Sequence, residues 1–159
     1  MPKLPMRVAV ENRDVAALAE AFAPDAVLHS PITSKLTFTG RDQIVAVFQV
    51  ILEEFEGITY TDEVRQGDVA FLVTRATVGG EEIEILDYMR LDAEDRIREL
   101  TVFFRPLPAT AVALRRIGAG LGRRRSPRRA ALISALVAPL ALMARAGDGF
   151  GVRLVKPAL

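Results

Sequence analysis

The sequence contains no cysteine and only one histidine among its 159 residues. A chain without cysteine has no disulfide framework, no thiolate nucleophile and no cysteine-based metal site, and a single histidine makes a histidine-based metal site unexpected. A glycine-rich phosphate loop is also missing, so we expect neither a nucleotide nor a metal cofactor. The opening residues, MPKLPMRVAVENRD, hold no apolar run long enough for a signal peptide. These absences favour a cytoplasmic protein without a cofactor.

Charge is distributed unevenly along the chain. Residues 1–117 contain 13 Lys/Arg and 19 Asp/Glu, a net charge of −6, whereas residues 118–159 contain 8 Lys/Arg and one Asp, a net charge of +7. Five arginines fall in the string RRRSPRR, residues 123–129. The basic tail, residues 118–159, is expected to contact an anionic partner or the acidic body, residues 1–117, itself. We therefore divide the chain into a domain of residues 1–117 and a basic, apolar extension of residues 118–159.

The hydrophobic pattern changes from helical to strand-like along the domain. It predicts helices over residues 6–11, 15–23 and 40–57, and short strands over 26–30 and 36–39. Longer strands follow over residues 58–66, 68–78, 82–91 and 96–105, separated by turns of hairpin length. This order predicts an α+β fold with an antiparallel meander.

An aspartate interrupts the apolar face of the strand predicted over residues 82–91. Asp87 shares this face with Ile83, Ile85, Met89 and Leu91, because alternate residues of a strand point the same way. If Gly79-Gly80 is a two-residue hairpin loop, Asp87 lies opposite Leu72 and faces apolar neighbours. Such burial raises the pKa of a carboxyl, so Asp87 is a candidate acid or base near neutral pH. The alternative is a structural carboxylate satisfied by a tyrosine, an arginine or a backbone amide.

Several strings resemble one known family: FAPDAVLHSP, GRDQIVAVF, the Gly79-Gly80 hairpin and LDYMRLDAEDRIRELTVFFRP. Together, over about residues 6–117, they resemble a SnoaL-like domain of the nuclear-transport-factor-2-like superfamily. The resemblance implies a cone-shaped, curved antiparallel sheet packed around helices, with a pocket inside. It also implies a homodimer through the outer face of the sheet.

Ketosteroid isomerases share this fold, and their catalytic groups can be compared residue by residue. Asp87 matches a carboxylate of their oxyanion hole, whereas Ser30 stands at the position of their general base. Met6 falls near their oxyanion-stabilising tyrosine and cannot donate a hydrogen bond. Steroid isomerisation by that mechanism is therefore not expected. The resemblance to SnoaL-like cyclases, which use a pocket aspartate, implies that Asp87 is the catalytic residue and Ser30 its hydrogen-bonding helper.

The expected pocket is apolar and binds a small apolar molecule. His29 is included among its ligand-binding residues, with a structural or surface role as the alternative because it alternates with Leu28 and Ser30. The other expected ligand-binding residues are Leu28, Phe48, Leu52, Leu72, Ile85, Met89, Leu100, Val102 and Phe104.

The outer sheet face and the tail suggest contacts beyond the pocket. Phe103, Tyr88 and Phe71 would form an exposed patch, which we interpret as the homodimer interface. In the extension we expect a short helix over 108–117, a hinge at 118–122, a helix over 130–144, a flexible segment at 147–151 and a short strand at the end. The 130–144 helix would pack on the domain, or alternatively contact an anionic membrane surface weakly. Nucleic-acid binding is not expected, because the tail has few aromatics and the body is acidic.

The sequence thus favours a pocket protein, and an enzyme that uses Asp87 for acid–base chemistry of an isomerase, cyclase or hydrolase type on an apolar substrate. The alternatives are non-catalytic binding of a hydrophobic ligand and a dimeric interaction module.

Overall fold

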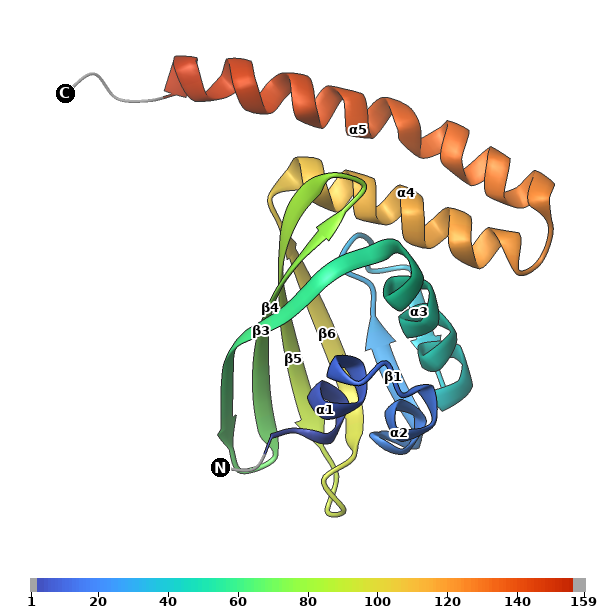
Figure 1. Cartoon of the computed structure of the whole chain (residues 1–159), viewed down its shortest axis with the longest axis vertical. Helices are drawn as coiled ribbons and strands as arrows, with labels where there is room; N and C mark the ends of the chain where they lie inside the picture. Colours follow the sequence, from blue (N-terminus) through green and yellow to red (C-terminus); the bar gives the residue numbers. More distant parts are fainter. Residues whose placement is uncertain (1–2, 156–159) are drawn as a thin grey trace.

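The computed structural model describes residues 3–155 and the side chains of residues 3–147. Within these residues six strands form one curved sheet in the order β2–β1–β6–β5–β4–β3 (Figure 1). The strands are β1 (Phe22–His29), β2 (Thr37–Thr39), β3 (Phe55–Gln66), β4 (Val69–Val78), β5 (Glu81–Leu91) and β6 (Ile97–Arg105). The helices are α1 (Pro5–Glu11), α2 (Val15–Glu20), α3 (Arg41–Glu54), α4 (Leu107–Arg123) and α5 (Pro127–Val155). The predicted α+β class and curved sheet are confirmed.

The hairpin of β4 and β5, which positions Asp87, has the predicted register. Gly79 and Gly80 have φ angles of 55° and 83°, a conformation that suits glycine in a two-residue hairpin loop. Asp87 therefore pairs with Leu72, as predicted, and Ile85 pairs with Thr74. The strands from β3 to β6 form the expected antiparallel meander, while β1 joins β6 in parallel.

Two predicted helices are too long. The helix predicted over residues 15–23 ends at Glu20, although Asp14 caps its start by accepting a hydrogen bond from the Ala17 amide at 3.0 Å. Pro24 does not stop this helix but lies inside β1, where the pairing with β6 is irregular and a missing N–H costs no ladder bond. The helix predicted to end at Gly57 ends at Glu54, because β3 begins at the buried Phe55.

The extension is more helical than its glycines suggest. The hinge predicted at residues 118–122 is wrong, since α4 runs through them as helix. A Cβ on Gly120 would lie 2.4 Å from Val50 Cγ1, so this glycine permits close packing of α4 on α3. Pro139 lies inside α5, and the flexible segment and strand predicted after residue 147 are helical as far as residue 155. Residues 156–159 of that predicted strand lie outside the described residues.

The helices enclose one end of the cone. α1, α2 and α3 lie on one side of the sheet, α4 crosses its end, and α5 runs along the side of α4 that faces away from the sheet (Figure 1). The fully buried core between the layers includes Met6, Leu18, Phe22, Ile44, Leu72, Met89 and Leu100.

Candidate functional site

An apolar cavity of about 130 Å³ lies between the inner face of the sheet, α3 and α4. Strands β1, β3, β4, β5 and β6 contribute to its wall, and α4 covers it with Leu114, Ile117, Gly118 and Leu121. Gly118 and Leu121 belong to the extension of residues 118–159. The extension therefore forms part of the cavity wall. Pro31, Ile32 and Leu36 from the segment between β1 and β2 line the rim.

The expected pocket residues other than His29 fall into two groups. Seven line the cavity: Leu28, Ser30, Phe48, Ile85, Asp87, Val102 and Phe104. Four others are buried in the core but do not line it: Leu52, Leu72, Met89 and Leu100. Alternation along a strand identifies a buried face, but both the core and the cavity are built on that face.

Asp87 stands in this apolar wall without a partner. It lies on β5 between Leu72 of β4 and Val102 of β6, and only 6% of its surface is accessible to solvent. Among the described residues no hydrogen bond or ion pair compensates its charge, and burial raises the pKa of this carboxyl from 3.8 to about 7. Near neutral pH both protonated and ionised forms are therefore populated. Such a group can act as an acid and as a base.

Two hydroxyl groups lie on the same inner face as Asp87. Tyr60 of β3 pairs with Thr74 of β4, and Thr74 lies two residue pairs along the β4–β5 ladder from the Leu72–Asp87 pair, on the same face. Burial, followed by the Asp87 charge, raises the pKa of the Tyr60 phenol above its usual range, so it remains a hydrogen-bond donor. The Thr74 Oγ1 is buried and has no hydrogen-bond partner among the described residues. All three residues line the cavity.

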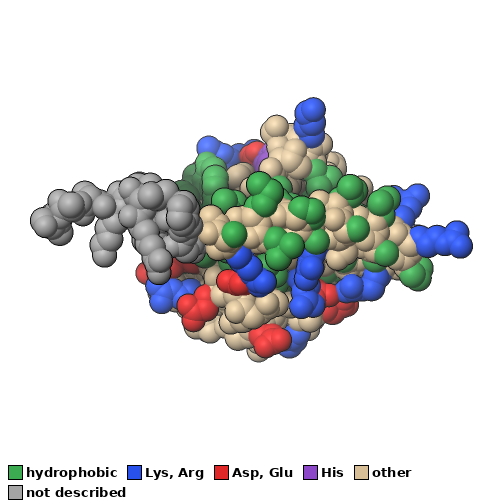
Figure 2. Space-filling model, turned by 90° about the horizontal axis from the view of Figure 1, so that it is seen from above, with side chains coloured by type: hydrophobic (Ala, Val, Ile, Leu, Met, Phe, Trp, Pro, Cys, Tyr) green, Lys and Arg blue, Asp and Glu red, His purple; other side chains and the backbone are tan. Residues whose placement is uncertain are grey.

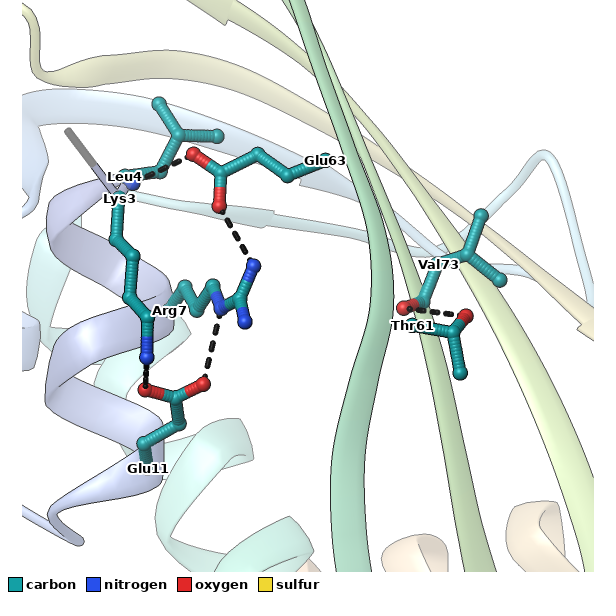
Figure 3. A network of polar contacts seen from close by, with 7 residues as sticks. All are labelled: Lys3, Leu4, Arg7, Glu11, Thr61, Glu63 and Val73. Carbon is teal, nitrogen blue, oxygen red and sulfur yellow. Dashed lines mark hydrogen bonds and ion pairs between the residues drawn. The ribbon is translucent and has the colours of Figure 1, made fainter. Parts of the chain in front are cut away.

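An ion pair between Arg7 of α1 and Glu63 of β3 links the helix to the strand that carries Tyr60 (Figure 3). Arg7 donates to Glu11 at 2.9 Å and to Glu63 at 3.0 Å, and Glu63 also accepts the Leu4 amide at 2.8 Å. The guanidinium carbon of Arg7 lies 5.5 Å from the centre of the Tyr60 ring. This network fixes β3 next to a break in its register with β4, between Tyr60 and Asp62.

The structure corrects the expectation for His29 and places Ser30 at the rim. His29 Nε2 lies 2.9 Å from Glu99 Oε1, and His29 is absent from the cavity wall because it alternates with Leu28, which lines it. Ser30 Oγ accepts a hydrogen bond from the Ile32 amide at 3.3 Å, within the rim segment. Among the described residues no three His, Asp or Glu side chains are grouped to hold a metal ion.

Neither Thr74 nor Tyr60 was among the residues that the sequence predicted for the site. The signal was present in both cases. Thr74 lies two residues from both Leu72 and Ala76, so the three share the buried face of β4. Thr74 is therefore a polar residue on a buried face, as Asp87 is on the next strand. Tyr60 was harder to place, because an irregular strand shifts the alternation that assigns a side chain to a face.

Comparison with known proteins places this geometry in a family. The model of the SnoaL-like domain matches residues 6–100. No curated protein sequence shows a significant match.

Solved structures with the same fold are numerous, and many of them have no assigned function. A steroid delta-isomerase from Pseudomonas aeruginosa has 27% identity and a TM-score of 0.64, covering 77% of this chain and 87% of that one. A bacterial protein with a cystatin-like fold from Silicibacter pomeroyi DSS-3 has 22% identity and a TM-score of 0.69, covering 79% and 86%. A nuclear-transport-factor-2-like protein of unknown function from Cytophaga hutchinsonii has 16% identity and a TM-score of 0.54, covering 66% and 88%.

Proposed function

The chain belongs to the SnoaL-like domain family of the nuclear-transport-factor-2-like superfamily, and on this premise we propose that it catalyses proton transfer on a small apolar carbonyl compound. The family includes isomerases and polyketide cyclases. One observation carries the proposal, namely the unpartnered Asp87 carboxyl in an apolar cavity, with a pKa of about 7. A structural aspartate is normally paired, because a buried unpaired carboxylate is costly.

Three polar groups of the cavity, those of Asp87, Tyr60 and Thr74, suit this chemistry. The Asp87 carboxylate takes a proton from the carbon next to the substrate carbonyl, and the resulting carboxylic acid returns it to the same or another carbon. Tyr60 and Thr74 donate hydrogen bonds to the carbonyl oxygen, which gains negative charge in the transition state. Protons balance within the site, so the step needs no other reagent.

The size of the cavity restricts the substrate. A cavity of about 130 Å³ is close to the roughly 150 Å³ that holds a benzene molecule in an apolar protein interior. A single ring with one carbonyl group fits this space, whereas a steroid would require α4 or the rim segment to move. We therefore expect monocyclic or short-chain ketones to be better substrates than fused-ring ones.

Hydrogen–deuterium exchange of cyclohexanone in heavy water tests the proposal without knowledge of the natural product. Proton NMR measures the loss of signal at the carbons next to the carbonyl. We expect the protein to accelerate this exchange, because the protonated Asp87 carboxyl exchanges its proton for deuterium from the solvent before it returns a hydrogen to carbon. Asp87→Asn should reduce the acceleration about 100-fold or more while ketone affinity changes little. Thr74→Val should lower the rate about 100-fold, because one donor to the carbonyl oxygen is lost.

Asp25→Asn is the matched control, since Asp25 is an exposed carboxylate on β1. It should exchange like the unchanged protein. If the unchanged protein binds the ketone without accelerating exchange, the cavity belongs to a ligand-binding protein. If Asp87→Asn catalyses exchange as fast as the unchanged protein, Asp87 is not the base. Either result means that the catalytic proposal is wrong.

A further inference from the structure

A second feature, distant from Asp87, is the outward face of α5. Five large apolar side chains on it are between 45% and 72% exposed: Leu132, Leu136, Leu140, Leu142 and Met143. The opposite face packs against α4 through buried Ala130, Ala141 and Ala144. Figure 2 shows the apolar side chains running along the helix. Single exposed apolar residues are ordinary, but a continuous stripe of this length marks a contact surface.

Basic residues stand at one end of the stripe. Arg128 and Arg129 precede it on α5, and Arg125 lies just before the helix; all three are exposed. Within the described residues they form no ion pair, and residues 127–147 contain no Asp or Glu. In Figure 2 blue side chains gather at the end of the helix opposite the grey residues.

Other arginines of the extension form ion pairs with the acidic domain of residues 1–117. Arg123 contacts Glu54 at 2.5 Å and Arg124 contacts Glu53 at 3.2 Å, both on α3, and Arg145 contacts Glu81 at 2.7 Å. The acidic body thus neutralises part of the tail and fixes the α4–α5 pair in place. Arg125, Arg128 and Arg129 keep their charge available for an external anion.

We propose that α5 docks on the surface of an anionic lipid bilayer, with Leu132, Leu136, Leu140 and Met143 in the acyl boundary and Arg125, Arg128 and Arg129 on the lipid headgroups. An apolar helix face and a basic cluster together supply the two signals that stable attachment to a membrane surface requires. Residues 127–147 are also long and apolar enough to span a bilayer, by length and composition alone. A surface position fits the structure better, because spanning would strip α5 from α4 and break the Arg145–Glu81 pair.

The chain contains no tryptophan, which gives a direct spectroscopic test. Leu136→Trp places a single reporter on the stripe, and Val8→Trp places one at an exposed position of α1 as the control. With vesicles of phosphatidylcholine and phosphatidylglycerol, we expect the emission of Leu136→Trp to shift to shorter wavelength and that of Val8→Trp to remain unchanged. Vesicles of phosphatidylcholine alone should give little shift, and added salt should weaken the response.

Co-sedimentation with the same vesicles tests the named residues in the full chain. The double variant Leu132→Glu, Leu140→Glu and the double variant Arg128→Glu, Arg129→Glu should each lower binding at least tenfold, whereas Val8→Glu should bind normally. Circular dichroism establishes that each variant is folded. Arg128→Glu, Arg129→Glu changes exposed residues only, so this variant still tests the proposal if Leu132→Glu, Leu140→Glu unfolds.

Three results would overturn the proposal. The first is equal binding to neutral and anionic vesicles, or none to either. The second is protein that resists extraction from vesicles by alkaline carbonate, which would show a spanning helix. The third is self-association that the Leu132→Glu, Leu140→Glu variant abolishes without any vesicle binding, which would show that a second copy covers the stripe.

Discussion

At the scale of single residues, Asp87 makes the stability of the protein depend on pH in an unusual direction. Most acidic groups have a lowered pKa in the folded state, but burial raises that of Asp87 from 3.8 to about 7. Below about pH 4 the carboxyl is protonated in both states and has no effect. Between about pH 4 and 7 the unfolded chain releases this proton while the folded chain retains it, so the folded state loses stability as the pH rises.

We therefore expect Asp87→Asn, which does not titrate, to gain stability relative to the unchanged protein as the pH rises from 4 to 8. The gain should be on the order of 4 kcal/mol, from 1.36 kcal/mol for each unit of pKa difference. Urea unfolding at several pH values measures it, with Asp25→Asn as the control that should show no such trend. A difference that does not change with pH would mean that the ionised carboxyl has a partner in the folded protein.

The same residue links stability to catalysis. If the ionised form of Asp87 abstracts the substrate proton, the rate of ketone exchange should rise through about pH 7 and then level off. The protein would thus be most active where Asp87 destabilises it most, a trade-off that is common at active sites.

At the scale of helices and strands, the sequence was most informative where one rule determines the outcome. The Gly79-Gly80 loop determines the register of β4 and β5, and hence the neighbours of Asp87. Sequence reasoning failed where a glycine or proline has two possible uses. Residues 118–122 read as a hinge because glycine favours flexibility, but Gly120 is there because α3 is too close for a side chain. That proximity depends on tertiary packing, which local sequence does not encode.

The role of Gly120 predicts an inverted effect for a substitution that normally stabilises helices. Alanine in a helix interior is favoured over glycine by about 1 kcal/mol. In Gly120→Ala, however, the new methyl group would lie 2.4 Å from Val50 Cγ1, and we expect a net loss of about 1–3 kcal/mol. Thermal unfolding measures this loss.

Two further variants isolate the cause of that loss. Gly147→Ala on α5, where an added Cβ meets nothing within 4 Å, should be neutral or slightly stabilising. Adding Val50→Ala to Gly120→Ala should restore space, so that the two substitutions are less harmful together than their sum. Simple additivity would show that the helices do not approach as described.

At the scale of the whole molecule, the outer face of the sheet forms an apolar surface away from both the cavity and α5. Phe71 stacks on Tyr88 with ring centres 5.1 Å apart, and Phe103, 52% exposed, lies on the adjacent strand β6. Beyond them Arg75 and Arg105 both contact Glu84, at 3.4 and 3.1 Å, giving the patch a polar border. An apolar centre with a polar rim is typical of a protein interface.

We expect this patch to pair with its own copy across a two-fold axis, because a two-fold interface brings the same patch of both subunits together and is the commonest arrangement of homodimers. Phe103→Glu would bury a carboxylate from each subunit in the apolar centre of the patch, so the dimer should weaken at least about 100-fold. Size-exclusion chromatography with light scattering should show twice the mass of one chain for the unchanged protein and a single chain for the variant. Val8→Glu should remain dimeric, and Leu132→Glu with Leu140→Glu separates this interface from any association through α5. A monomeric unchanged protein would leave the patch without this role.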